Sequence, residues 1–187
     1  RALPKKGVIV CCRKPGLFYL FAHRPVTTFA KTLRIDSLIA DLKRKGITHI
    51  VVDQMGFADV GRYLVPAVQR DALKFPILHT EPAPDDPKKL TYLLGFKPAL
   101  GYDGAWVNGL KQGKGLMRYP DGSWLQGEWV NDTLNGEGVF HRVDGGRVEG
   151  HWFIGSLNGE GRVIAADGTV QQEGIWENGK LRSGVAH

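Results

Sequence analysis

The chain has 187 residues, of which 42% are apolar, and a formal net charge of +6. This composition is typical of a globular protein of one or two domains, and no stretch reaches the roughly 18 consecutive apolar residues that cross a bilayer as a helix. The adjacent cysteines Cys11 and Cys12 favour neither a disulfide framework nor a zinc site. Because the chain begins at Arg1, we expect a piece processed or excised from a longer protein.

Charge is distributed unevenly along the chain. Residues 1–100 hold 17 Lys and Arg against 8 Asp and Glu, whereas residues 101–187 hold 8 against 11. A basic first part could meet phosphates, anionic lipid or an acidic partner, although a solvated surface is the commoner reason for such an excess. The short cluster Lys43-Arg44-Lys45 is typical of a helix end, so we predict no nucleic-acid binding.

The first hundred residues alternate between strand and helix patterns. In chain order they predict a buried strand over 7–12, an undecided apolar element over 17–22, a helix from an Asp36 N-cap to Gly46, a strand over 47–53, a helix over 62–73, a short strand over 75–80, a proline-rich loop over 81–87 and a last strand over 90–96. This order predicts a first domain over residues 1–98, a small α/β sandwich with a mostly parallel sheet.

Four polar residues of this domain are candidates for a small ligand site. Arg13 and Lys14 follow the first predicted strand, Asp53 ends another strand, and Arg62 begins a helix. Because α/β folds place functional groups at strand ends, these residues could bind a sugar phosphate or a nucleotide sugar. A salt bridge or a helix cap is the commoner role for such residues. The sequence predicts no catalytic residue, no cofactor and no metal site, since the six histidines show no ligand spacing.

Three segments of the same domain resemble a known group of proteins. Residues 8–21, 45–53 and 62–68 are similar to the segment that follows the last transmembrane helices of lipid-linked-sugar-dependent glycosyltransferases, the protein-mannosyltransferase-like and aminoarabinose-transferase-like group. The resemblance implies a membrane-associated parent protein and a place on the extracytoplasmic, periplasmic side. The catalytic acidic residues of that group lie in loops outside this chain, so no catalytic residue is carried over and enzyme activity stays open.

The second part of the chain contains an internal repeat. Trp106, Trp129, Trp152 and Trp176 are spaced by 23, 23 and 24 residues, and Gly104, Gly127, Gly150 and Gly174 each precede one of them by two positions. Fixed periods of this length indicate a repeat architecture. Asp-Gly pairs at 121–122, 144–145 and 167–168, with opposite turns at 108–109, 131–132, 154–155 and 178–179, predict an antiparallel β-hairpin meander over residues 99–187.

The regular spacing of tryptophan and glycine has a packing interpretation. A glycine two residues before a tryptophan shares its face of the strand, so we expect the missing side chain to leave room for the ring of a neighbouring repeat. The tryptophans could form either a core ladder or a sugar-binding platform, and we favour the core.

Residues 102–109, followed by Gly113-Lys114-Gly115, resemble the MORN repeat, and the likeness extends over about residues 102–181. Trp124, Val148 and Asp132 depart from the pattern, and the last unit is truncated. The resemblance implies protein–protein contacts or dimerisation, with a membrane-proximal place and lipid binding as further possibilities. The net acidic charge of this part argues against anionic headgroups as its ligand.

Three functions remain open at this point. The first is a non-catalytic extracytoplasmic region of a glycosyltransferase-like membrane protein, with the repeat as a protein-docking surface. The second is a free-standing scaffold that associates with itself through the repeat sheet and its edge strands. The third is a small α/β domain that binds a sugar phosphate or nucleotide sugar.

Overall fold

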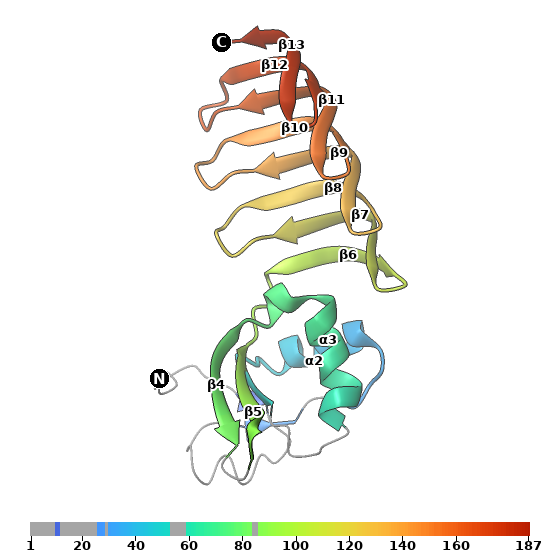
Figure 1. Cartoon of the computed structure of the whole chain (residues 1–187), viewed down its shortest axis with the longest axis vertical. Helices are drawn as coiled ribbons and strands as arrows, with labels where there is room; N and C mark the ends of the chain where they lie inside the picture. Colours follow the sequence, from blue (N-terminus) through green and yellow to red (C-terminus); the bar gives the residue numbers. More distant parts are fainter. Residues whose placement is uncertain (1–9, 12–25, 29, 53–58, 84–85) are drawn as a thin grey trace. The chain divides into compact units, whose positions relative to one another are not determined.

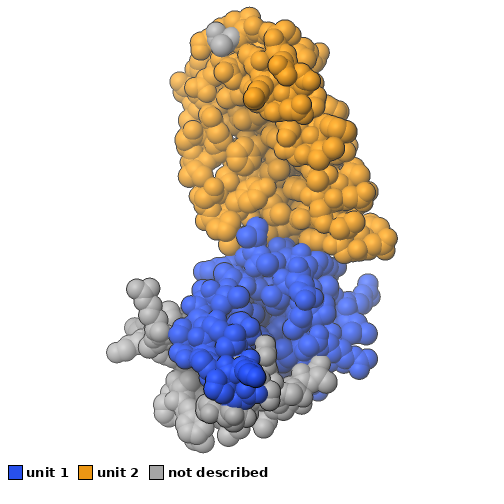
Figure 2. Space-filling model, in the orientation of Figure 1, with its two compact units in different colours: residues 1–99 blue, residues 100–187 orange. Residues whose placement is uncertain are grey.

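A computed structural model describes residues 10–11, 26–28, 30–52, 59–83 and 86–187. The chain divides into two compact units, Arg1–Ala99 and Leu100–His187, which Figure 2 shows in separate colours. In the described part of the chain, none of the helices is long and apolar enough to span a bilayer.

The first unit is built on a five-stranded sheet with short helices. Its elements are β1 (Val10–Cys11), β2 (Val26–Thr27), α2 (Ile35–Arg44), β3 (His49–Val52), the π-helical turn η1 (Val60–Leu64), α3 (Val65–Arg70), the 3-10 turn η2 (Ala72–Lys74), β4 (Ile77–Ala83) and β5 (Asp86–Gly95). The strand order is β2-β1-β3-β5-β4. The helices α2 and α3 lie together beside this sheet (Figure 1).

Buried apolar side chains hold the first unit together. Leu38, Ile39 and Leu42 lie on one face of α2, at the three- and four-residue spacing that brings side chains above one another on a helix. They join one core cluster with residues of the sheet and the later helices, among them Ile50, Leu64, Phe75, Leu94 and Phe96.

The prediction of a mostly parallel sheet is wrong, because the sheet is mixed. β1 pairs in parallel with β2 and β3, but β5 is antiparallel to both β3 and β4. A parallel pair needs a crossover of a dozen or more residues, whereas β4 ends at Ala83 and β5 begins at Asp86. The predicted loop over 81–87 therefore lies mostly within a hairpin.

Two local predictions in this unit are confirmed in part. The helix predicted from Asp36 is α2, but it begins at Ile35 with no side-chain cap, and the Asp36 carboxylate accepts a hydrogen bond from Arg70 at 2.5 Å instead. The helix predicted over 62–73 is divided among η1, α3 and η2. The predicted element over 17–22 lies outside the described residues.

The second unit is a single antiparallel sheet of eight strands. These are β6 (Gly101–Val107), β7 (Leu110–Arg118), β8 (Trp124–Val130), β9 (Thr133–His141), β10 (Arg147–Phe153), β11 (Ser156–Ile164), β12 (Val170–Glu177) and β13 (Lys180–Ala186). The order along the sheet follows the order along the chain, so the predicted meander is confirmed (Figure 1).

Two kinds of turn alternate along this meander. The longer turns contain Gly122, Gly145 and Gly168, each with φ between 87° and 95°, as the Asp-Gly pairs predict. The two-residue turns, which we call the tight turns, are residues 108–109, 131–132, 154–155 and 178–179, and in each both residues have positive φ. This is the geometry of a type I′ turn, which joins twisted antiparallel strands without splaying them.

Backbone hydrogen bonds connect the last three tight turns to the preceding repeat. The amides of Asp132, Gly155 and Gly179 donate to the carbonyl oxygens of Lys111, Leu134 and Leu157, at 3.2, 2.9 and 2.9 Å. These bonds recur with the repeat and tie neighbouring hairpins together, which suits an array whose repeats depend on their neighbours for stability.

Candidate interaction surface

Of the four residues in the predicted small-ligand site, the structure describes only Arg62. Arg13, Lys14 and Asp53 lie outside the described residues, so their arrangement stays a prediction. Arg62 is exposed in η1, and its guanidinium carbon lies 5.7 Å from the centre of the Tyr63 ring. An exposed arginine over a neighbouring ring is a common surface arrangement and by itself indicates no ligand.

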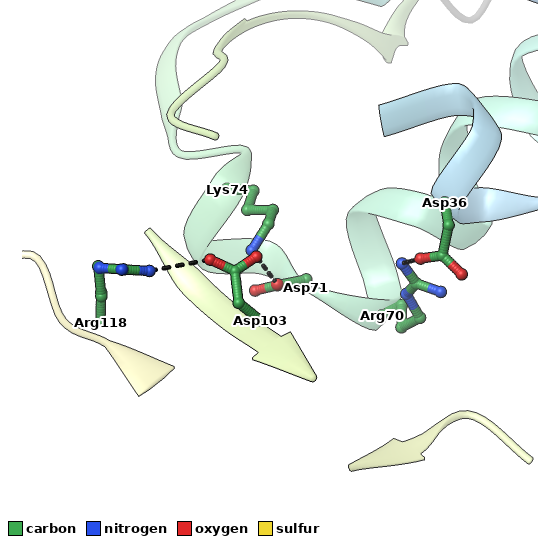
Figure 3. Close-up of polar contacts among 6 residues, drawn as sticks. All are labelled: Asp36, Arg70, Asp71, Lys74, Asp103 and Arg118. Atoms are coloured by element: carbon green, nitrogen blue, oxygen red, sulfur yellow. Dashed lines mark hydrogen bonds and ion pairs between the residues drawn. The ribbon is translucent and has the colours of Figure 1, made fainter. Parts of the chain in front are cut away.

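Polar contacts in the first unit have structural roles. Lys74 and Asp71 are both buried and form an ion pair at 2.8 Å, and Arg70 pairs with Asp36 (Figure 3). The same figure shows a separate pair in the second unit, between Arg118 and Asp103 at 2.8 Å. A buried pair that lies within one turn of chain holds that turn in place and is weak evidence for chemistry.

The tryptophans of the second unit form its core, as predicted. Trp129, Trp152 and Trp176 are buried, and their indole N–H groups donate to the carbonyl oxygens of Gly115, Gly138 and Gly161 at 3.2, 2.9 and 2.9 Å. Trp106 is partly buried against the same cluster, in edge contact with Tyr102. Because the buried rings present no open face, they cannot serve as a sugar platform.

The glycines that precede the tryptophans belong to a longer row. Each strand contributes one glycine paired with a glycine of the next strand, and we call these eight residues the glycine row: Gly104, Gly115, Gly127, Gly138, Gly150, Gly161, Gly174 and Gly184. A Cβ atom at Gly150 would lie 2.3 Å from the Glu160 carbonyl oxygen. The glycines therefore permit close approach of neighbouring backbones.

The prediction that these glycines make room for tryptophan rings is wrong at the positions for which it was made. We expected a side chain at Gly104, Gly127 or Gly150 to block a tryptophan ring, but the nearest atoms are those of Tyr102, of Leu134 and of the neighbouring backbones. The tryptophan contact instead occurs at Gly138, where a Cβ would lie 3.1 Å from Trp152. The pairing of neighbouring strands determines which glycine contacts which ring. The spacing of residues within one strand does not predict these contacts.

Exposed apolar side chains gather at the tight turns. The apolar tip row is our name for five residues that flank or lie in three consecutive tight turns: Val107, Leu110, Val130, Phe153 and Ile154. All are exposed, Phe153 by 51% and Ile154 by 63%. In a meander, these turns all lie along one side of the sheet (Figure 1). Exposed apolar side chains that gather in one place, unlike single ones, mark interaction sites.

Ile154 also has a strained backbone. Its φ is 47°, in the left-handed region, where the three equivalent positions hold Asn108, Asn131 and Asn178. Asparagine tolerates this conformation, whereas a β-branched residue there is an outlier. An exposed apolar residue kept at a strained position is the kind of feature that accumulates at functional sites.

A groove lies on the sheet face opposite the aromatic core. It has a volume of about 780 Å³, and the residues that line it are Gly138, Gly150, Gly161 and Gly174 with their neighbours Glu137, Val139, Glu149, Glu160, Arg162, Glu173 and Ile175. Side chains alternate between faces along a strand, so these neighbours point away from the core side chains that pack against the glycines.

Asp132 and His141 are among the titratable groups of this unit whose pKa is shifted. The backbone N–H of Lys111, which donates to the Asp132 carboxylate at 2.8 Å, lowers the pKa of Asp132. Burial lowers the pKa of His141, whose ring stacks on Trp124 with 3.5 Å between centroids. Asp132 thus joins one tight turn to the preceding repeat, and both groups contribute to packing.

Sequence reasoning missed both the apolar tip row and the groove. The tip row has a sequence signal, because Val107, Val130 and Phe153 each follow a repeat tryptophan. The groove has a weaker one, a glutamate before the glycine in four consecutive strands. Neither signal indicates a surface until strand pairing shows which residues are neighbours.

The second unit is thus a β-hairpin repeat array that presents a tip row and an open groove, a class of protein used for binding and assembly. In comparison with known families, the model of the MORN repeat matches residues 102–124, 126–147 and 149–170. The unit therefore contains three MORN repeats, followed by the fourth hairpin, β12–β13. No curated protein matches the chain.

Proposed function

We propose that the chain is an interaction scaffold that associates with a second copy through the apolar tip row. The observation that carries this proposal is the gathering of five exposed apolar side chains on three consecutive tight turns. The MORN repeats support a role in protein interaction. The described part of the chain shows no cluster of three or more histidines, cysteines, aspartates or glutamates able to hold a metal ion.

The repeat makes this surface suitable for pairing with itself. Successive tight turns are separated by two strands, which corresponds to about 9.6 Å along the sheet. The apolar tip row has a constant spacing, so it can pack against the apolar tip row of a second copy across a two-fold axis. Each tight turn then contacts equivalent turns of the other copy. Such a contact buries the exposed apolar area of both copies.

Sedimentation velocity over a range of concentrations tests this proposal. We expect a reversible dimer, which Val130→Asp weakens at least tenfold because each interface would then bury two carboxylates. Val143→Asp is the matched control: Val143 is also exposed, but it lies in a longer turn, at the opposite ends of the strands from the tight turns. We expect that control to change the dimer affinity less than twofold.

A monomer at every concentration would overturn the proposal, and so would equal effects of the two aspartate variants. Phe153→Asp provides a second test in the next repeat, and circular dichroism confirms that each variant is folded. If only the edge strands mediated association, all three variants would dimerise like the wild type, which would also contradict a contact through the tips.

The glycosyltransferase context of residues 1–98 stays a second proposal. It is supported by the resemblance of residues 8–21, 45–53 and 62–68, and it carries with it the extracytoplasmic, membrane-associated location. The reading frame of the parent gene tests it: we expect a series of hydrophobic helices upstream of Arg1. A parent without them would refute this context and leave the scaffold proposal intact.

A sugar-phosphate or nucleotide-sugar site at Arg13, Lys14, Asp53 and Arg62 is a further prediction for the first unit. Thermal shift with a panel of phosphates and nucleotide sugars tests it, because a ligand that binds the folded state raises the melting temperature. An unchanged melting temperature across the panel would remove this prediction.

A further inference from the structure

We propose that the groove on the open face of the MORN array binds a short, extended, lysine- or arginine-rich segment of a partner protein. The glycine row supplies its floor, and side chains of β9, β10, β11 and β12 supply its two sides. This surface is separate from the apolar tip row, so the proposal does not depend on self-association.

Strand pairing arranges the groove's charges in a regular way. Each of the four strands places one glutamate directly before its glycine, and because the strands are antiparallel, successive glutamates fall on alternate sides of the glycine row. One side carries Glu137, Glu160 and Ile175, and the other carries Val139, Glu149, Arg162 and Glu173. The lining of the groove thus contains four carboxylates and one guanidinium, and its net charge is negative.

Only part of this negative charge is neutralised within the array. Glu149 pairs with Arg147 at 3.0 Å and with Arg162 at 2.9 Å, and Glu137 lies 3.2 Å from an exposed histidine, His151. Among the residues that the structure describes, Glu160 and Glu173 have no ion-pair partner, and both are exposed. A cationic ligand would therefore meet at least two free carboxylates.

The dimensions suit a short extended segment better than a folded domain. Neighbouring strands are about 4.8 Å apart, so the floor extends about 14 Å from β9 to β12. An extended chain rises about 3.3 Å per residue, and four or five residues would cover that distance. The apolar side chains of Val139 and Ile175 can contact the methylene stems of lysine or arginine.

The chemistry of the groove also indicates which ligands it should reject. Carboxylates repel phosphates and anionic lipid headgroups, so those ligands are disfavoured. A basic segment gains charge complementarity together with apolar contact along its stems. Because the carboxylates are exposed, we expect micromolar rather than nanomolar affinity and strong dependence on salt.

Fluorescence anisotropy with fluorescein-labelled hexalysine and the full chain tests this proposal, with labelled hexaglutamate as the control peptide. We expect hexalysine to bind and hexaglutamate not to bind. The variant Glu160→Gln/Glu173→Gln should weaken hexalysine binding at least tenfold. The matched variant Glu128→Gln/Glu177→Gln removes the same charge from positions of the sheet outside the groove and should weaken binding less than threefold.

Three results would overturn the proposal: no binding of hexalysine at low salt, equal losses in the two double variants, or a loss of self-association in Glu160→Gln/Glu173→Gln without a loss of peptide binding. The third result would mean that a second copy occupies the groove. Conversely, a protein that binds hexalysine but never dimerises would refute the tip-row contact and support the groove.

Discussion

At the scale of single residues, the tight turns of the MORN array show how a backbone requirement and a surface requirement can conflict. Three of the four turns have asparagine at the first left-handed position, and the fourth has Ile154 at φ 47°. The same residue is among the most exposed large apolar residues of the array. Stability favours asparagine there, whereas the proposed contact favours isoleucine.

Replacing Ile154 with asparagine should therefore stabilise the array. We expect the free energy of unfolding to rise by about 1 kcal/mol, because the strain of a β-branched residue in the left-handed region is relieved. Urea unfolding followed by tryptophan fluorescence measures this selectively, since all five tryptophans lie after residue 100. The reverse change, Asn131→Ile, should destabilise by a similar amount; two effects of the same sign would contradict this account.

The glycine row gives a second prediction at this scale. Gly150→Ala should lower the unfolding free energy by about 3 kcal/mol, since its Cβ would collide with the Glu160 carbonyl oxygen at 2.3 Å and its φ is 146°. Gly155→Ala, at φ 74° with no atom within 4 Å of the new Cβ, should cost only about 1 kcal/mol. Equal losses in the same fluorescence experiment would argue against close backbone approach.

At the scale of secondary-structure elements, α2 depends on one buried carboxylate. Asp41 is 9% exposed and accepts hydrogen bonds from the Ala30 amide at 3.0 Å and from Arg44, and its carboxylate also pairs with Lys45 at 2.8 Å. Burial alone would raise the pKa of Asp41, but Lys45, Arg44 and the Ala30 amide outweigh it, so the pKa lies below its ordinary value. The ionised form is therefore the one that stabilises the fold.

This shift determines the sign of a pH effect. The contribution of Asp41 to stability is complete above the pKa of an unfolded aspartate, about 3.9, and it is lost as pH falls through the lower folded value. We expect Asp41→Asn to cost about 1–3 kcal/mol near neutral pH and less in acid. Circular dichroism at 222 nm during urea unfolding reports this, because the described helices all lie in the first unit.

Asp36→Asn is the control for that experiment. Asp36 lies in the first turn of the same helix and pairs with Arg70, but its side chain is 81% exposed. Because Asp36 itself is exposed and only its partner Arg70 is largely buried, we expect the control to lose less stability than Asp41→Asn at neutral pH. If the two variants lost the same stability at neutral pH, the buried contacts of Asp41 would not have the role described.

The elements also show where sequence patterns are sufficient and where they are not. Asp-Gly pairs and the tryptophan period predict the turns and strands of the MORN array, because those signals are local and repeat. The short loop between the last two predicted strands favours an antiparallel pair, but the pairing of β5 with β3 could not be predicted, because these strands lie far apart in the sequence and no local signal joins them. Asp36 is not the N-cap, because α2 begins at Ile35 and places Asp36 inside its first turn, where the carboxylate accepts a hydrogen bond from Arg70.

At the scale of the whole molecule, the candidate surfaces were harder to predict than the fold. The residues of the groove come from four strands, and only the register of those strands places Glu160 and Glu173 over one floor of glycines. The tip row likewise depends on three turns lying along one side of the sheet. Spacing in the sequence predicts the repeat, whereas the neighbours across strands determine what the repeat displays.

Hydrogen–deuterium exchange of the full chain at low and high concentration tests the proposed scaffold contact most directly. The account predicts that peptides covering the tight turns at 108–109, 131–132 and 154–155 exchange more slowly as concentration rises, while peptides covering the longer turns around Gly122, Gly145 and Gly168 do not change. Exchange that is independent of concentration in both sets, or slowed equally in both, would contradict a contact through the apolar tip row.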